Sequence, residues 1–194
     1  NTISDAEVDS LEDLLDGCEY MLTQLETNVS SVERIVDIAC KKGVKVILNT
    51  APVQPISDEL LSKVDLITPN EVEAEILTGV KVDSEEAADK AAEWFFGKGV
   101  KRVLITLGGR GVYINTGDKK GIIPAYKVNA IDTTGAGDAF IGSLLYQLAE
   151  DGVTTDSIAD LTEDKLEEYL KKSNGYCAKS VLENGAIASY PTSL

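Results

Sequence analysis

The chain has 194 residues, 43% of them hydrophobic and 26% charged, which is enough for one globular domain and ordinary for a folded protein. Its net charge of −15 disfavours nonspecific binding to nucleic acid or anionic membranes, although backbone N–H groups can still hold a phosphate. The sequence has no histidine and three widely spaced cysteines, which argues against histidine catalysis, histidine zinc sites and a disulfide framework. Free thiols suit a reducing cytoplasm, and no apolar run is long enough to cross a bilayer. We therefore expect a cytoplasmic protein with small-molecule ligands and no nucleic-acid or membrane partner.

The first half of the chain alternates short apolar runs with amphipathic segments. This alternation predicts βαβ units and a mostly parallel sheet, so the fold class is α/β. In chain order the expected elements are an apolar run at Tyr20–Leu25, a helix over Val29–Lys42, a strand at Val44–Leu48, a short helix from Ser57 to Lys63, a strand at Asp65–Thr68, a helix from Asn70 to Leu77, a helix over Glu86–Phe96 and a strand at Arg102–Leu107.

The pattern changes after Gly108. Two short strands, Gly111–Asn115 and Gly121–Ile123, flank a polar turn and predict a hairpin. An apolar helix over Ala139–Leu148, an acidic connection at Glu150–Asp164 and a last helix over Leu166–Leu182 follow. No shift in composition marks a boundary, so residues 1–194 are predicted to form one domain.

The most informative segment is Asp132-Thr-Thr-Gly-Ala-Gly-Asp138. Its small residues let the backbone approach a ligand closely, and they open into a helix whose free N–H groups can hold a phosphoryl anion. Asp138 lies beside these groups, where a carboxylate can accept a proton from an attacking hydroxyl. The alternative is a plain helix cap after a glycine loop. The Asp-Thr pair upstream and the unbroken apolar helix downstream favour the phosphoryl-transfer interpretation.

This segment resembles the signature of the ribokinase-type (pfkB) family of carbohydrate kinases. The resemblance covers essentially the whole chain and implies a three-layer α/β/α sandwich with a mostly parallel sheet. Other segments that agree in order and content are Leu22–Glu26, Leu48–Pro52, Pro69–Glu75 with Leu77-Thr78-Gly79, and Leu104–Val112.

The resemblance also implies roles for individual residues. Asp138 is the expected general base, which also contacts the sugar, and Gly135, Ala136 and Gly137 form the expected anion hole for the γ-phosphate of ATP. Glu26 matches a sugar-contacting glutamate. The expected ATP-binding residues are Asn70, Glu73, Thr106, Leu107, Gly108, Gly109, Arg110, Gly111, Gly137, Asp138 and Asn174.

Two metal ions are implied in the same way. Glu73 is expected to help place Mg²⁺ through water, because this ion gives up its water reluctantly. A monovalent cation, K⁺, is expected beside the anion hole, in part through backbone carbonyls. Its expected ligands are Asp132, Thr134, Ser180, Glu183, Gly185 and Ser189.

Simpler interpretations of these residues stay open. Asn70 can be only the N-cap of its helix, and Glu73 and Glu26 can be solvated surface acids. Gly108–Gly111 can be an ordinary hairpin loop. Asn174 lies beside Ser173 and Gly175 in a predicted helix, which is unusual for a good helix and favours a function.

The sequence departs from the family in two places. The N-terminal part of the family, with its glycine-rich sugar motif and β-sheet lid, has no counterpart before Asn1. We therefore expect an incomplete sheet, self-association of the isolated chain through exposed apolar surface, and no sugar-dependent ATP turnover by this chain alone. The acidic connection at 150–164 is also longer than expected. For the full-length protein the resemblance implies a homodimer.

The sequence thus predicts an ATP-dependent kinase acting on the primary hydroxyl of a pentose, with D-ribose favoured. A family member acting on fructose, a sugar acid or a nucleoside is one alternative. A nucleotide-binding module without catalysis is another, but the retained Asp138 argues against it. No GxGxxG after the first strand and no Walker GxxxxGK[ST] motif occurs, which argues against a dinucleotide-binding or P-loop protein.

Overall fold

The computed structural model describes residues 2–192. At its centre is a six-stranded sheet whose strands lie side by side in chain order. The first four strands are parallel, and the last two pair antiparallel with their neighbours. The mostly parallel sheet and the hairpin after Gly108 are therefore confirmed. The strands are β1 (Tyr20–Thr23), β2 (Lys45–Leu48), β3 (Leu66–Ile67), β4 (Arg102–Thr106), β5 (Val112–Asn115) and β6 (Lys120–Ile123).

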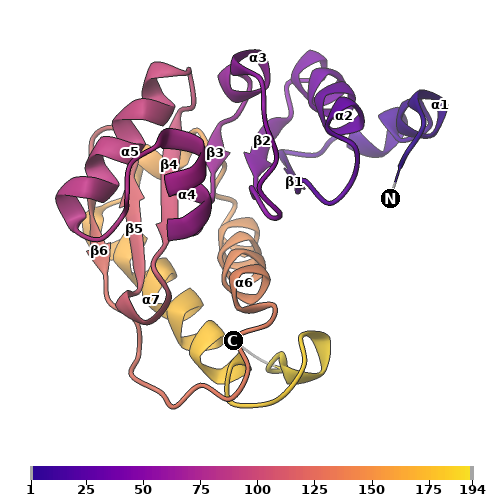
Figure 1. Ribbon diagram of the computed structural model, residues 1–194. Coiled ribbons are helices and arrows are strands. Elements are labelled where there is room, and N and C mark those ends of the chain that lie inside the picture. Colours follow the sequence, from indigo (N-terminus) through magenta and orange to yellow (C-terminus); the bar gives the residue numbers. More distant parts are fainter. Residues whose placement is uncertain (1, 193–194) are drawn as a thin grey trace.

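Helices cover both faces of this sheet (Figure 1). One hydrophobic core lies between the sheet and α2 (Val29–Lys41), α3 (Asp58–Ser62), α4 (Glu71–Thr78) and α5 (Glu85–Gly97). A second core lies between the opposite face and α6 (Ala136–Glu150) and α7 (Glu163–Ser180). Short 3₁₀ turns complete the described chain: η1 (Glu12–Leu15), η2 (Gly108–Arg110), η3 (Ser157–Asp160) and η4 (Ile187–Ser189).

The side chains of strand β4 pack alternately into the two hydrophobic cores. Val103 and Ile105 belong to the first core and Leu104 to the second, and all three side chains are fully buried. Successive side chains of a strand point to opposite faces, so a sheet covered on both sides needs a continuous apolar run. This distribution confirms the expected three-layer α/β/α sandwich.

Most predicted elements differ from the observed ones by one to three residues at their ends, and two differences concern the site or the core. The helix predicted from Ala139 begins at Ala136, because Gly135 takes a φ of 74° as its N-cap and lets the helix start inside the motif. The helix α1 (Asp5–Asp9) was not predicted. Its signal is present in the sequence, since Ser4 and Glu7 form a capping box, and the buried Val8 attaches α1 to the core.

The acidic connection between α6 and α7 is held against the sheet by basic side chains. Arg102 Nη2, at the start of β4, donates to the carbonyl of Asp156 at 2.9 Å, and Lys45 Nζ, at the start of β2, lies 2.8 Å from the Asp156 carboxylate. Lys119 Nζ donates to the carbonyls of Ala159 and Leu161. These contacts lie at the amino ends of the strands, which leaves the carboxyl ends for the site described next.

Candidate active site

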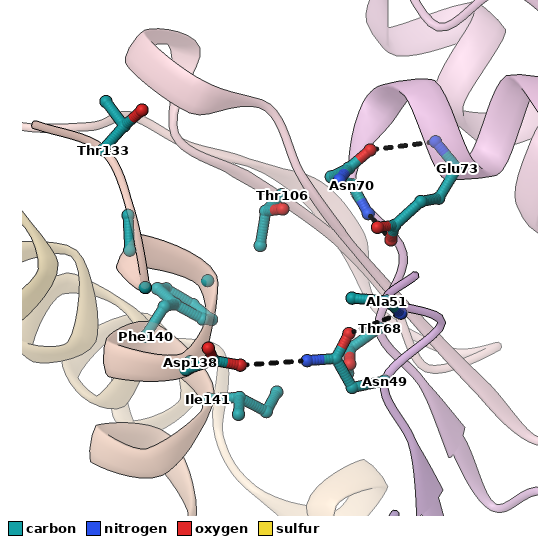
Figure 2. A pocket seen from close by; sticks show the side chains of 13 residues that line it. Asn49, Ala51, Thr68, Asn70, Glu73, Thr106, Thr133, Asp138, Phe140 and Ile141 are labelled. Atoms are coloured by element: carbon teal, nitrogen blue, oxygen red, sulfur yellow. Dashed lines mark hydrogen bonds between the residues drawn. The ribbon is translucent and has the colours of Figure 1, made fainter. Parts of the chain in front are cut away.

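A pocket of about 180 Å³ lies where the carboxyl ends of β2, β3 and β4 meet the N-terminus of α6 (Figure 2). Ligands of open α/β sheets bind at this edge, because loops and helix N-termini converge there. The pocket brings together seven of the predicted residues with several that were not predicted. Its lining is Asn49, Ala51, Thr68, Asn70, Glu73, Thr106, Thr133, Gly135, Ala136, Gly137, Asp138, Phe140 and Ile141.

Backbone donors at the start of α6 form one wall of the pocket. Among the described residues, the N–H groups of Gly135, Gly137 and Asp138 have no hydrogen-bond acceptor, and α6 has no side-chain cap. The N–H of Ala136 differs from the prediction, because it donates to the carbonyl of Thr133 at 3.1 Å. Unpaired N–H groups at a helix N-terminus carry partial positive charge, so this wall suits an anion.

Gly135 is required at this turn for two reasons. Its φ of 74° lies in the left-handed region that other residues avoid, and a Cβ there would lie 2.5 Å from the hydroxyl oxygen of Tyr190. The Tyr190 hydroxyl donates to the Gly135 carbonyl at 3.2 Å, which joins the C-terminal segment to the loop. Burial, followed by the nearby Asp138 carboxylate, raises the pKa of Tyr190, so its hydroxyl stays protonated as a donor.

Asp138 lies in the first turn of α6 and is exposed to the pocket. Its Oδ1 accepts hydrogen bonds from Gln24 Nε2 at 2.9 Å and from Asn49 Nδ2 at 3.5 Å. Figure 2 shows the Asn49 contact reaching across the pocket from the end of β2. Both bonds end on Oδ1, so Oδ2 is the oxygen that remains for a ligand.

Asn70 and Glu73 form the opposite wall and are also a helix cap. Asn70 Oδ1 accepts from the N–H groups of Val72 and Glu73, and Glu73 Oε2 accepts from the N–H of Asn70, all at 2.9 Å. Glu73 Oε2 also accepts from the hydroxyl of Thr50. Glu73 is only 8% exposed, so the interpretation of Glu73 as a solvated surface acid is wrong. The capping role of Asn70 is real and coexists with its place in the pocket.

The loop Leu107–Gly111 does not line this pocket, although Thr106 does. Arg110 Nη2 donates to the carboxylate of Glu71 and to the carbonyl of Val82, both at 2.6 Å, which ties the loop to α4. Gly111 has a φ of 108°, and a Cβ there would lie 2.0 Å from the carbonyl oxygen of Ile123. The exposed loop glycines Gly108 and Gly109 stay open to solvent beside it.

Two other predicted residues lie outside the pocket lining. Asn174 is buried and donates through Nδ2 to the carbonyls of Ile123 and Pro124, at 3.3 and 3.1 Å. Glu26 is exposed and lines a separate hollow of about 570 Å³ beyond the end of β1, together with Leu22 and Gln24.

Three of the predicted cation ligands, Asp132, Thr134 and Gly185, are connected to one another by hydrogen bonds. Asp132 Oδ1 accepts from the N–H and hydroxyl of Thr134, and its Oδ2 accepts from the N–H of Gly185 at 2.9 Å. These bonds, led by the one from Gly185, lower the pKa of Asp132 to about 2. The hydroxyl of Ser180 donates to the carbonyl of Cys177, and the hydroxyl of Ser189 to the carbonyl of Ala186, while Glu183 is exposed.

Side-chain metal clusters are not a feature of this site. Within residues 2–192, no three His, Cys, Asp or Glu side chains group closely enough to hold a metal ion. Across the same residues, none of the helices combines the length and apolar character needed to span a membrane.

Sequence reasoning about single residues missed Gln24, Asn49, Thr68 and Phe140. The first three follow β1, β2 and β3, so the rule that parallel strands present their carboxyl ends at one edge could have found them. Phe140 belongs to the apolar face of α6, and only packing places it at the pocket.

The family model described as pfkB family carbohydrate kinase matches residues 12–193. The chain is similar to a ribokinase from Haemophilus influenzae, with 47% identity over 174 residues, which is 90% of this chain and 53% of that protein. It is similar to a deoxyribokinase from Salmonella typhi, with 33% identity over 191 residues, 98% of this chain and 58% of that protein. A solved structure of Arabidopsis thaliana ribokinase complexed with ribose and ATP has a TM-score of 0.80 at 28% identity, covering 98% of this chain and 57% of that one.

The chain thus spans between half and three fifths of the length of these relatives. Its sheet, its helices on both faces and its Asp132–Asp138 motif at the head of α6 agree with the family match. The expectation drawn from the motif is confirmed: the chain belongs to the pfkB family of carbohydrate kinases.

Proposed function

We propose that the protein catalyses ATP-dependent phosphorylation of the primary hydroxyl of a pentose, with D-ribose as the favoured substrate. The observation that carries this proposal is the head of α6. There, the Asp138 carboxylate lies in one pocket with the N–H groups of Gly135 and Gly137, which have no acceptor within residues 2–192. A base and an anion hole side by side are what transfer of a phosphoryl group to a hydroxyl requires.

In the proposed reaction, Asp138 Oδ2 accepts the proton of the sugar hydroxyl while the hydroxyl oxygen forms a bond to the γ-phosphorus of ATP. The bond from that phosphorus to the β–γ bridging oxygen breaks, and its electron pair leaves with ADP. The N–H groups of Gly135, Gly137 and Asp138 stabilise the negative charge on the equatorial oxygens. Ala136 joins them if its bond to the Thr133 carbonyl opens when the phosphate binds.

The other predicted residues fit the binding of nucleotide and Mg²⁺. Asn70 and Thr106 line the same pocket, and Arg110 fixes the loop that follows Thr106 to α4. In this proposal the loop Leu107–Gly111 and Asn174 hold the rest of the nucleotide. Both hydrogen bonds accepted by Glu73 end on Oε2, so Oε1 remains for a water of the Mg²⁺ ion. When bound, Mg²⁺ neutralises charge on the phosphates.

A monovalent cation fits the residues around Asp132 less directly. The carboxylate of Asp132 already accepts from the N–H of Gly185 and from Thr134, so it serves first to join the loop to the C-terminal segment. A K⁺ ion there would use the remaining lone pairs of Asp132 and backbone carbonyls, and would order the same loop. Ser180, Glu183 and Ser189 complete the proposed set.

Ribose is favoured because the Haemophilus influenzae relative, at 47% identity, is a ribokinase and the Arabidopsis thaliana ribokinase structure is a complex with ribose and ATP. The deoxyribokinase similarity keeps 2-deoxyribose as the main alternative, and fructose, sugar acids and nucleosides remain further ones. The alternative of a nucleotide-binding module without catalysis is disfavoured, because a pure binder has no use for a carboxylate beside its anion hole.

The test is a coupled ADP-release assay on the full-length protein with MgATP, K⁺ and ribose, 2-deoxyribose, fructose or adenosine. We expect turnover with ribose, and a loss of about 10²- to 10⁴-fold in kcat for Asp138→Asn, the usual range for removal of a general base. ATP binding should survive in the variant. If ATP binds but neither these four compounds nor a sugar acid stimulates ADP release, the non-catalytic alternative holds instead.

A further inference from the structure

We propose that Gln24, assisted by Asn49, is a positioning residue that fixes the carboxylate of Asp138 in its reactive orientation. This inference rests on the proposed function and extends it to residues that the motif does not contain. A carboxylate on the first turn of a helix is free to rotate, and a base acts only when one oxygen faces the substrate hydroxyl.

The end of β1 is itself rigidly placed, which makes Gln24 suitable for this role. Beyond the paired strands, the N–H of Asn49 donates to the carbonyl of Thr23 at 2.9 Å, and the N–H of Leu25 donates to the carbonyl of Ala51 at 3.0 Å. The side chain of Leu25 is 1% exposed. Leu25 is anchored in the first core, and the adjacent Gln24 side chain reaches Asp138 from this fixed segment.

The donor end of each amide is determined by its partners. Asp138 can only accept when ionised, so the Gln24 atom 2.9 Å from Oδ1 is the NH₂ nitrogen. Asn49 is 7% exposed, and its Oδ1 accepts from the N–H of Ala51 at 3.2 Å. Its NH₂ group is therefore the end that faces Asp138, at the longer distance of 3.5 Å.

The amide groups of Gln24 and Asn49 both donate to Oδ1 of Asp138, which decides the oxygen that can act as the base. The two bonds leave Oδ2 as the free oxygen. Because both donors are neutral amides, they orient the carboxylate and leave its negative charge in place, whereas a Lys or Arg at the same position would offset that charge. Gln24 makes the shorter bond and is therefore expected to contribute more than Asn49.

The experiment measures kcat and KM in the ADP-release assay for Gln24→Met, which keeps the length of the side chain and removes the donor. We expect kcat to fall about 10- to 100-fold, as for a misplaced reacting group, while the KM values for ATP and sugar stay within about twofold. The matched control is Gln54→Met, a half-buried glutamine away from the pocket, which should retain wild-type kcat.

A double variant separates positioning from a general structural effect. In an Asp138→Asn background, Gln24→Met should lower the residual rate no further, because the group that it positions is already gone. The inference is overturned if Gln24→Met keeps wild-type kcat, if it lowers the rate equally in both backgrounds, or if it raises only the KM for sugar. A wild-type protein without sugar-dependent turnover would overturn the proposed function, and this inference with it. Wild-type turnover with an unaffected Gln24→Met overturns this inference alone.

Discussion

At the scale of single residues, the loop before α6 depends on contacts that reach it from the far end of the chain. The Tyr190 hydroxyl donates to the carbonyl of Gly135, and the N–H of Gly185 donates to the carboxylate of Asp132. A glycine-rich segment has many conformations to lose on folding, so these two tethers are what hold its N–H groups in one arrangement. Changes at Gly135 and Asp132 test this directly.

Gly135→Ala should destabilise the protein and abolish sugar phosphorylation. The left-handed backbone alone costs about 1–2 kcal/mol for alanine, and the new Cβ would overlap the Tyr190 hydroxyl oxygen at 2.5 Å. Adding Tyr190→Phe should recover part of the stability, because the overlapping hydroxyl is gone. Gly142→Ala is the control, since nothing lies within 4 Å of its Cβ position in α6, and it should stabilise by about 0.5–1 kcal/mol. Urea unfolding of the wild type and the three variants measures their free energies of unfolding.

Asp132→Asn should lower stability at neutral pH but have no effect in strong acid. The pKa of Asp132 is lowered from 3.8 to about 2 in the folded protein. The contribution of the ionised carboxylate to stability is therefore fully present above pH 3.8 and is lost as the pH falls through about 2. The Tm of the variant should therefore lie below that of the wild type at pH 7, and the two values should converge near pH 2. A Tm difference that stays constant across this range would show that the carboxylate charge is not involved.

At the scale of elements, α4 starts with residues that serve both the helix and the pocket. The capping box of Asn70 and Glu73 satisfies the first N–H groups of the helix and fixes both side chains at the pocket wall. The preceding Thr50 hydroxyl, at the end of β2, holds the Glu73 carboxylate from the other side. The same two side chains thus start the helix and line the proposed ligand pocket.

Asn70→Ser and Asn70→Ala separate these two contributions. Serine keeps a capping oxygen, so the free energy of unfolding of Asn70→Ser should lie within a few tenths of a kcal/mol of the wild-type value. That of Asn70→Ala should be lower by about 1 kcal/mol. If Asn70 also contacts the nucleotide, both variants should bind ATP more weakly to a similar extent, as measured by calorimetric titration. Wild-type ATP affinity in Asn70→Ser would assign the residue to capping alone.

At the scale of the whole molecule, the connection between α6 and α7 is fastened to the sheet edge opposite the pocket. Arg102 is 8% exposed and holds the carbonyl of Asp156, while Lys119 holds the carbonyls of Ala159 and Leu161. The acidic character of the segment is matched by Lys45 on Asp156. This docking gives the long connection a structural explanation that its sequence did not provide.

Arg102→Met should loosen this connection without disturbing the pocket. Loss of the guanidinium leaves the Asp156 carbonyl without its donor and the Lys45 ion pair without a fixed partner. We expect limited proteolysis to cut within residues 151–162 several times faster than in the wild type. Lys101→Met, which removes an exposed lysine one residue earlier, is the control. Equal cutting rates in all three proteins would contradict the proposed fastening.

The α/β class, the order of most elements and the position of the Asp132–Asp138 motif before a helix could all be predicted from the sequence. Apolar runs such as Arg102–Leu107 specify buried strands, and the small residues of the Asp132–Asp138 motif are followed directly by the apolar residues of a helix. These features depend on residues close together in the chain, so a pattern can express them. The capping box of Ser4 and Glu7 that starts α1 is a local signal of the same kind.

The way in which distant residues share the site follows from the packing of the fold and could not be predicted from the sequence. Gln24 and Asp138 are separated by 114 positions, and Asp132 and Gly185 by 53, yet each pair forms a hydrogen bond. Buried Glu73 likewise owes its environment to Thr50 at the end of another strand. Such contacts follow from the strand order and from helices packing across the sheet, because side-chain distances across a fold are set by packing and not by spacing along the chain.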